Sequence, residues 1–187
     1  MNLLEMVMGA QGGDVVSQVA NRFQLDEGQA RSAMGALIPA LSRGISRNAS
    51  EPQGLDDLIG ALANGNHSQY LEQPQKLGDP STVDEGNGIL GHVFGSKDVS
   101  RQVAAKASES TGIDSGILKQ MLPVLASVAM GAMSKNGFGS AVGAGSVNQL
   151  AGGQDSGIGG MLASFLDADK DGSVIDDVLG MASKFLR

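Results

Sequence analysis

The side chains with the most definite chemistry lie in one short acidic stretch, Asp167–Asp177. It reads Asp-Ala-Asp-Lys-Asp-Gly-Ser-Val-Ile-Asp-Asp, so Asp167, Asp169 and Asp171 alternate with other residues. Three carboxylates this close in sequence repel one another unless a cation or water lies between them. A set made only of oxygen ligands suits Ca²⁺ better than Mg²⁺, because Mg²⁺ demands a stricter octahedral geometry. The sequence therefore predicts a calcium site here.

The order of residues in this stretch follows most of the EF-hand loop pattern. The three aspartates take loop positions 1, 3 and 5, and Gly172 at position 6 permits the sharp turn. Ser173 at position 7 would offer its backbone carbonyl, and Val174 at position 8 would be the usual apolar anchor.

The stretch departs from the pattern at position 12, where an EF-hand has a bidentate Glu and this sequence has Val178. Asp176 and Asp177 come one or two residues earlier, and one of them would close the cation shell from the first turn of the following helix. Which of the two acts stays open. Because the bidentate ligand is missing, we expect weak binding, with a dissociation constant on the order of 10⁻⁴ to 10⁻³ M.

A second interpretation of the same stretch needs no metal. A similar pair, Asp56 and Asp57, lies in the segment Leu-Asp-Asp-Leu-Ile-Gly, and no aspartate triad precedes it. Paired aspartates complement the dipole at a helix N-terminus, and Ser173 with Asp176 fits a capping pattern. On this interpretation the stretch is a solvated acidic helix-turn-helix.

The element expected to organise the rest of the chain is a helix over Ile117–Met133, in which Ser127 is almost the only polar residue from Met121 onward. The run indicates a helix buried on most sides, and it is too short and interrupted for the roughly 18 to 20 apolar residues of a membrane span. Shorter amphipathic segments predict helices elsewhere. The expected fold is all-α: a multihelical bundle of two related helical-hairpin units plus a C-terminal helix-loop-helix.

An internal repeat underlies the two hairpin units. At a constant offset of 84, the residues Asp14, Val15, Gln18, Val19, Ala20, Pro39 and Leu41 match Asp98, Val99, Gln102, Val103, Ala104, Pro123 and Leu125. Each unit is expected to be a helix capped by its first aspartate, a turn at Asp26 or Asp114, and a second helix interrupted by proline. Because proline is costly inside a helix, the shared proline favours duplication over chance similarity between alanine-rich helices.

Two segments of the second unit carry a resemblance. They are Asp98-Val-Ser-Arg-Gln-Val-Ala-Ala-Lys and Thr111-Gly-Ile-Asp-Ser-Gly-Ile-Leu-Lys-Gln-Met-Leu-Pro-Val-Leu. Together they resemble the core of the bacterial YidB-like family, a domain of unknown function, over about residues 1–150. The resemblance implies an all-helical fold and a bacterial source, and it implies no catalytic residues.

Four regions follow from the composition along the chain. They are an N-terminal helical unit (1–66), a linker or loop (67–87), a second helical unit (88–153), and the C-terminal acidic loop and helix (154–187). The alternative for the second region is a plain surface loop, held in place by Tyr70 and Leu71.

Charge and composition bear on the kinds of partner. The formal net charge is -7, and the 13 Lys and Arg residues are scattered, whereas a nucleic-acid binder needs a clustered basic footprint. We therefore expect no nucleic acid and no membrane span. The chain has no Cys, and His67 and His92 lie in different segments, which argues against a transition-metal site. The N-terminal residues lack the basic start of a signal peptide, so a cytoplasmic location is expected.

These observations favour a non-enzymatic binding or structural protein of unknown biological role, with a weak Ca²⁺ site that orders its C-terminal helices. The alternative is a metal-independent helical interaction adaptor that uses its acidic surface. In either case surfaces rich in Gly, Ala and Met would support a homo-oligomer or a protein partner. An enzyme is not expected, because the sequence shows no nucleophile elbow and no phosphate-binding loop.

Overall fold

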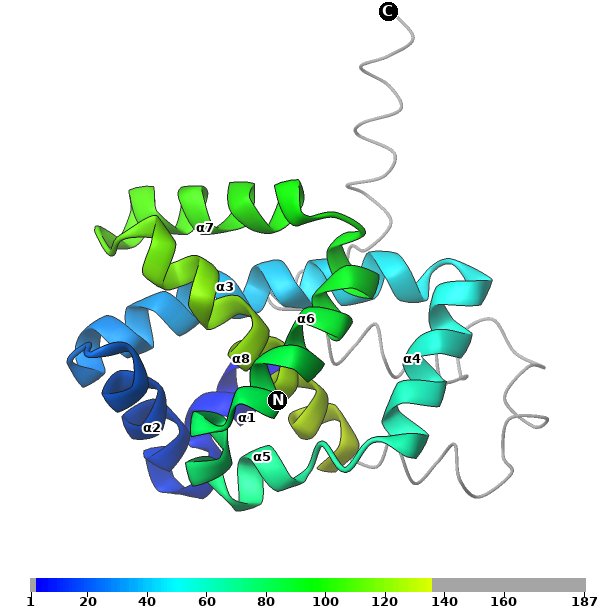
Figure 1. Ribbon diagram of the computed structural model, residues 1–187, viewed down its shortest axis with the longest axis horizontal. Helices are drawn as coiled ribbons and strands as arrows, with labels where there is room; N and C mark the ends of the chain where they lie inside the picture. Colours follow the sequence, from blue (N-terminus) through cyan, green and yellow to red (C-terminus); the bar gives the residue numbers. More distant parts are fainter. Residues whose placement is uncertain (1–2, 136–187) are drawn as a thin grey trace, which may run out of the picture.

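The structure is a computed structural model that describes residues 3–135, and this part of the chain is built from helices (Figure 1). In chain order they are α1 (Leu3–Gly9), the 3-10 helix η1 (Ala10–Gly13), α2 (Asp14–Phe23), α3 (Glu27–Ala49), α4 (Pro52–Asn64), α5 (Gln69–Glu72), the 3-10 helix η2 (Pro74–Gly78), α6 (Pro80–Phe94), α7 (Lys97–Thr111) and α8 (Ser115–Lys135). The all-α class expected from the sequence is confirmed for the described residues.

Helix α8 forms the centre of the fold. Every residue from Met121 to Met133 is buried, and α8 contacts each of the helices α1 to α7. Figure 1 shows α8 in the middle of the ribbon, with the other helices around it. The burial predicted for this run is therefore confirmed.

Helix α8 is also long and apolar enough to cross a membrane by length and composition, and it is the one such helix among the described residues. The sequence run alone had suggested that it is too short. However, 78% of its most apolar window is buried inside the protein. This is the placement of a core helix, so a membrane span is not clearly indicated.

One aspartate lies at the start of the second helix of each hairpin, as the sequence predicts: Asp26 before α3 and Asp114 before α8. Asp26 Oδ1 accepts from the backbone N–H of Gln29 at 2.7 Å, and Gln29 Oε1 accepts from the backbone N–H of Asp26 at 3.1 Å. This capping box satisfies two amides that the helix itself leaves without acceptors. Asp114 Oδ1 accepts from the backbone N–H groups of Gly116 and Ile117 at 2.8 and 3.3 Å.

The caps expected at Asp14 and Asp98 are wrong. The N-cap of α2 is Gly13, with φ at 106° and no side-chain hydrogen bond. The N-cap of α7 is Ser96, whose hydroxyl accepts from the backbone N–H of Val99 at 3.3 Å. Asp14 and Asp98 lie instead in the first turns, where a carboxylate still complements the helix dipole.

The repeat can be compared with the helix pairs α2–α3 and α7–α8. Pro39 lies inside α3, and Pro123 lies inside α8. The first helix of each pair ends at a residue in the left-handed region, Gln24 at φ 55° and Gly112 at φ 71°. These shared features support a duplicated hairpin, which stays a prediction.

The polar segment 67–87 contains α5, η2 and the N-terminal half of α6. Tyr70, Leu71 and Leu77 are buried in it, so apolar side chains hold it against the core. Pro80 is the first residue of α6, where its fixed φ suits a helix and its missing N–H leaves no bond unmade. The helix that contains residue 88, where the second helical unit was expected to begin, starts at Pro80. The division of the chain into four regions stays a prediction.

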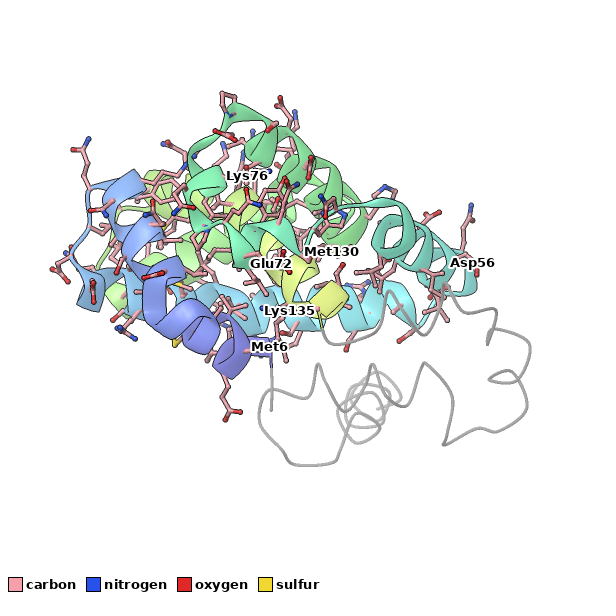
Figure 2. The ribbon with its side chains drawn as sticks, turned by 90° about the horizontal axis from the view of Figure 1, so that it is seen from below. Met6, Asp56, Glu72, Lys76, Met130 and Lys135 are labelled. Atoms are coloured by element: carbon pink, nitrogen blue, oxygen red, sulfur yellow. The ribbon has the colours of Figure 1, made fainter. Side chains whose placement is uncertain are left out.

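Helix α3 connects the two ends of the described structure. It contacts α4, α6 and α7, and α4 lies at the opposite end of the molecule from α2 (Figures 1 and 2). Figure 2 shows Asp56 on the outer side of α4. Helix α7 and the end of α6 both pack on α3. Residues along one side of α3 therefore line the surface between these three helices.

Candidate functional site

A groove runs between α3, α6 and α7, and small residues form its floor. Ala36, Ala40 and Gly44 line it from α3, and their spacing of four residues places them on one face of that helix. Ala107 adds a buried small side chain from α7. A Cβ at Gly44 would lie 2.5 Å from Val93 Cγ1, so the glycine is what allows the end of α6 to approach α3.

Larger apolar side chains form the walls of the groove. Val93 and Phe94 come from the end of α6, and Val99 and Val103 come from α7. Val99 is 37% exposed and is the one large hydrophobic residue that stands out to solvent among the described residues. The groove has a volume of about 680 Å³, which is enough for several side chains from one face of a helix.

Basic side chains stand on the rim. Arg43 and Arg47 lie one turn apart on α3, and Lys106 faces the groove from α7, with Glu109 as the one acidic lining residue. Within residues 3–135, no ion pair joins these three cations to a carboxylate. An apolar floor with a cationic rim favours a ligand that is apolar on one side and acidic beside it.

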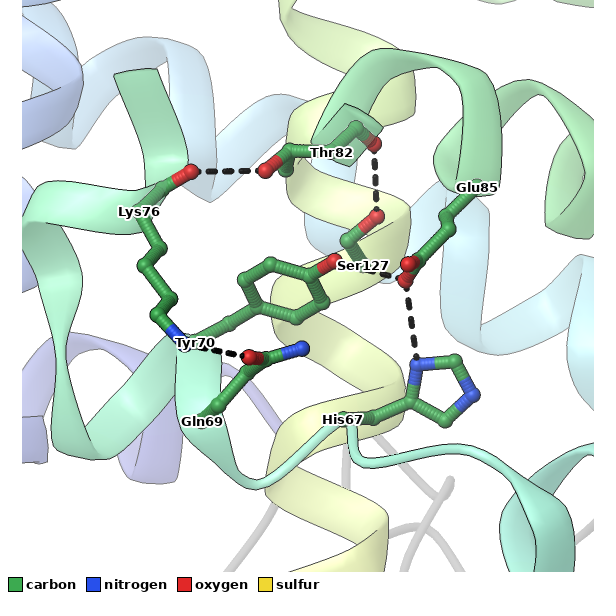
Figure 3. Close-up of polar contacts among 7 residues, drawn as sticks. All are labelled: His67, Gln69, Tyr70, Lys76, Thr82, Glu85 and Ser127. Atoms are coloured by element: carbon green, nitrogen blue, oxygen red, sulfur yellow. Dashed lines mark hydrogen bonds and ion pairs between the residues drawn. The ribbon is translucent and has the colours of Figure 1, made fainter. Parts of the chain in front are cut away.

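A network of polar side chains lies on the other side of α6 (Figure 3). The Tyr70 hydroxyl donates to Glu85 Oε2 at 2.6 Å, and the ring of Tyr70 is buried. Burial comes first among the causes that raise the pKa of Tyr70 to about 12, followed by the hydrogen bond to Glu85 and the negative charge of that carboxylate. The tyrosine is therefore a neutral hydrogen-bond donor at ordinary pH.

The same network connects α6 to the core helix. Ser127 is buried in α8, and its hydroxyl donates to the backbone carbonyl of Thr82 at 3.0 Å. The Thr82 hydroxyl in turn donates to the backbone carbonyl of Lys76 at 2.7 Å. These bonds satisfy polar groups that would be costly to bury alone, and they fix α6 and η2 on α8.

The predicted metal ligands Asp167, Asp169, Asp171, Ser173, Asp176 and Asp177 lie outside the described residues. Within residues 3–135, no group of three or more His, Asp or Glu side chains is placed to hold a metal ion. The comparison pair Asp56 and Asp57 lies beyond the first turn of α4, which begins at Pro52 and has no acidic residue in that turn, so the helix-start role expected for this pair is wrong.

The groove is not apparent from the sequence alone. Arg43 and Arg47 lie in the C-terminal half of α3, where basic residues are favourable for the helix dipole alone. The signal in the sequence was the pairing of these cations with the stripe Ala36, Ala40 and Gly44. That stripe becomes the floor of a groove only because α7 packs across it.

Comparison with protein-family models matches residues 5–136 to a family described as "Bacterial protein of unknown function (DUF937)". Neither the curated proteins nor the solved structures contain a match to the chain. The bacterial family and the unknown function expected from the resemblance are confirmed, while the YidB-like name stays a prediction.

Proposed function

The chain belongs to the bacterial family of proteins of unknown function DUF937, and on that premise we propose that it is a non-enzymatic binding protein whose groove receives an acidic amphipathic helix. The observation that carries the proposal is the groove between α3, α6 and α7, with its apolar floor and its cationic rim. Helix-in-groove recognition uses apolar anchors at spacings of i, i+4 and i+7 together with charge complementarity at the rim.

The proposed occupant is the chain's own segment 174–186. Its apolar residues Val174, Val178, Met181 and Phe185 recur at the spacing i, i+4, i+7 and i+11, which is the pattern of one helix face. Asp177 is three residues after Val174 and four before Met181, so on a helix it would stand beside the apolar face. The segment thus combines the two features that the groove favours.

Residues 136–173 connect the end of α8 to this segment. At about 3.3 Å per residue they would span on the order of 100 Å when extended, which is more than enough to reach the groove. A tethered segment acts at a high effective concentration, which favours docking within one molecule. Exchange of the segment between copies at high protein concentration would produce the expected self-association.

Disulfide trapping tests this docking directly, because the chain has no cysteine of its own. In full-length protein carrying Val99→Cys and Ala182→Cys, we expect oxidation to form the disulfide at least about tenfold faster than in a control pair. The control is Gln75→Cys with Ala182→Cys, since Gln75 is exposed on η2 and does not line the groove. Equal rates for the two pairs would reject the proposal, and electrophoresis distinguishes links within one molecule from links between two.

Charge reversal then tests the rim. Arg43→Glu with Arg47→Glu is expected to slow the trapping reaction by roughly fivefold, because exposed ion pairs contribute up to about 1 kcal/mol. Adding Asp177→Lys, the carboxylate beside the apolar face, is expected to restore most of the rate. If the arginine variants do not slow the trapping reaction, or if charge reversal on the segment does not restore its rate, charge plays no part in the docking.

A calcium site at Asp167–Asp177 is a second candidate function, supported by the alternating aspartates and the glycine at the sixth loop position. Calorimetric titration of the full chain is expected to show a dissociation constant on the order of 10⁻⁴ to 10⁻³ M. Asp169→Ala is expected to abolish the heat of binding, while Asp155→Ala, which lies outside the loop, retains it. Absence of heat at millimolar calcium would reject the site.

A further inference from the structure

A second cavity lies between α4 and α6. Its volume is about 240 Å³. Leu58 and Ala61 of α4 face Ile89 of α6 across it, and Ile45 of α3 and Met130 of α8 also line it. A cavity of roughly 150 Å³ is already large enough to bind benzene, so this one has room for a small organic molecule.

One polar side chain at this cavity is buried and lacks a hydrogen-bond partner. The His67 side chain is 10% exposed, and its Nδ1 atom forms no hydrogen bond in the described structure. The nearest carboxylate oxygen, Glu85 Oε2, lies 3.8 Å from Nδ1 (Figure 3) and already accepts from Tyr70. Buried polar atoms in native proteins are nearly always satisfied, so this nitrogen indicates a missing hydrogen-bonding group.

The charges around the cavity limit what that group can be. Glu85 and Asp57 both line it, and His92 Nδ1 lies 3.6 Å from Asp57 Oδ2. Neither Lys nor Arg is among its lining residues. Two carboxylates without a fixed cation favour a positively charged ligand and repel an anion.

We propose that this cavity binds a small amine with an apolar body. The ammonium group would lie beside Glu85 and His67 on the cavity side, where it can approach the carboxylate and donate to the imidazole nitrogen. The body would pack against Leu58, Ile89 and Met130. The site shares Val93 with the proposed helix-binding groove, and its other lining residues are different, so either proposal can fail without the other.

Three compounds that share a phenyl ring but differ in charge test the proposal on the full-length protein. Benzylamine is expected to bind with a dissociation constant on the order of 10⁻⁴ to 10⁻³ M, as is usual for ligands of this size. Benzyl alcohol is expected to bind at least about tenfold more weakly, and benzoate is expected not to bind. Equal binding of all three would overturn the assignment of charge, and no binding of benzylamine would overturn the site.

Two pairs of variants place the ligand in the cavity. Gly88 lines the cavity with open space around its Cβ position, so Gly88→Leu is expected to fill the cavity and abolish binding. Gly91→Leu is the matched control, since Gly91 is on the same helix with open space and does not line the cavity.

Glu85→Gln is expected to weaken the binding of benzylamine by about tenfold, and Glu72→Gln is expected to leave that binding unchanged. Circular dichroism confirms that each variant is folded, and unaltered binding in Gly88→Leu would overturn the proposal.

Discussion

Replacing Gly86 with alanine is expected to destabilise the protein by about 3 kcal/mol or more, the upper part of the range for an overpacked core. Gly86 is buried where α6 crosses α8. A Cβ built there would lie 1.9 Å from the backbone oxygen of Pro123 and 2.4 Å from its carbonyl carbon. A flexible side chain could turn aside, but these are backbone atoms of the central helix. The two helices would therefore have to separate, and they would lose contacts along their whole crossing.

The matched control lies two residues further along the same helix. Gly88 has no atom within 4 Å of its Cβ position, so Gly88→Ala is expected to stabilise the protein by up to about 1 kcal/mol through helix propensity alone. Urea unfolding followed by circular dichroism measures both free energies. If Gly86→Ala and Gly88→Ala changed stability by the same amount, the close crossing of α6 and α8 would be wrong.

The sequence predicted those parts of the fold that depend on local pattern. The apolar run from Met121, interrupted almost only by Ser127, identified the central helix, because a helix without a polar face has to be covered on all sides. Asp26 was recognised as a helix start for the same local reason. The cap at Ser96 was missed because Ser96 and Asp98 lie two residues apart and both residue types cap helices.

Features that depend on tertiary packing were not predictable in this way. The segment 67–87 has the composition of a loop, and only the pocket that buries Tyr70 against α8 explains why it folds into helices. His67 and His92 are far apart in sequence, and they line one cavity only because the chain after α4 returns to α6. The helix-binding groove is likewise a product of the crossing of α3 and α7. In this protein the strongly patterned helices follow from the sequence, whereas the helices of segment 67–87 and the candidate sites follow from tertiary packing.

Alkaline pH is expected to remove the stabilising contribution of Tyr70. The folded protein holds the phenol in its neutral form, because burial and Glu85 raise its pKa to about 12, whereas in the unfolded chain the phenol ionises near pH 10. The contribution is therefore complete below pH 10, falls as the pH rises, and is lost above pH 12. Two pKa units correspond to about 2.7 kcal/mol of unfolding free energy as an upper limit.

Tyr70→Phe supplies the reference for this effect, because pH-dependent contributions that the two proteins share cancel in the comparison. At pH 8 the variant is expected to be about 1.5 to 3 kcal/mol less stable, since it loses a hydrogen bond to a charged acceptor. The two stability curves should converge as the pH approaches 12. Tyr70 is the single tyrosine and the chain has no Trp, so the absorbance of the tyrosinate ion follows this residue alone. If the midpoint of the Tyr70 titration in the native state were near pH 10, both the burial of the phenol and its hydrogen bond to Glu85 would be contradicted. Either one would keep the proton on the phenol oxygen to higher pH.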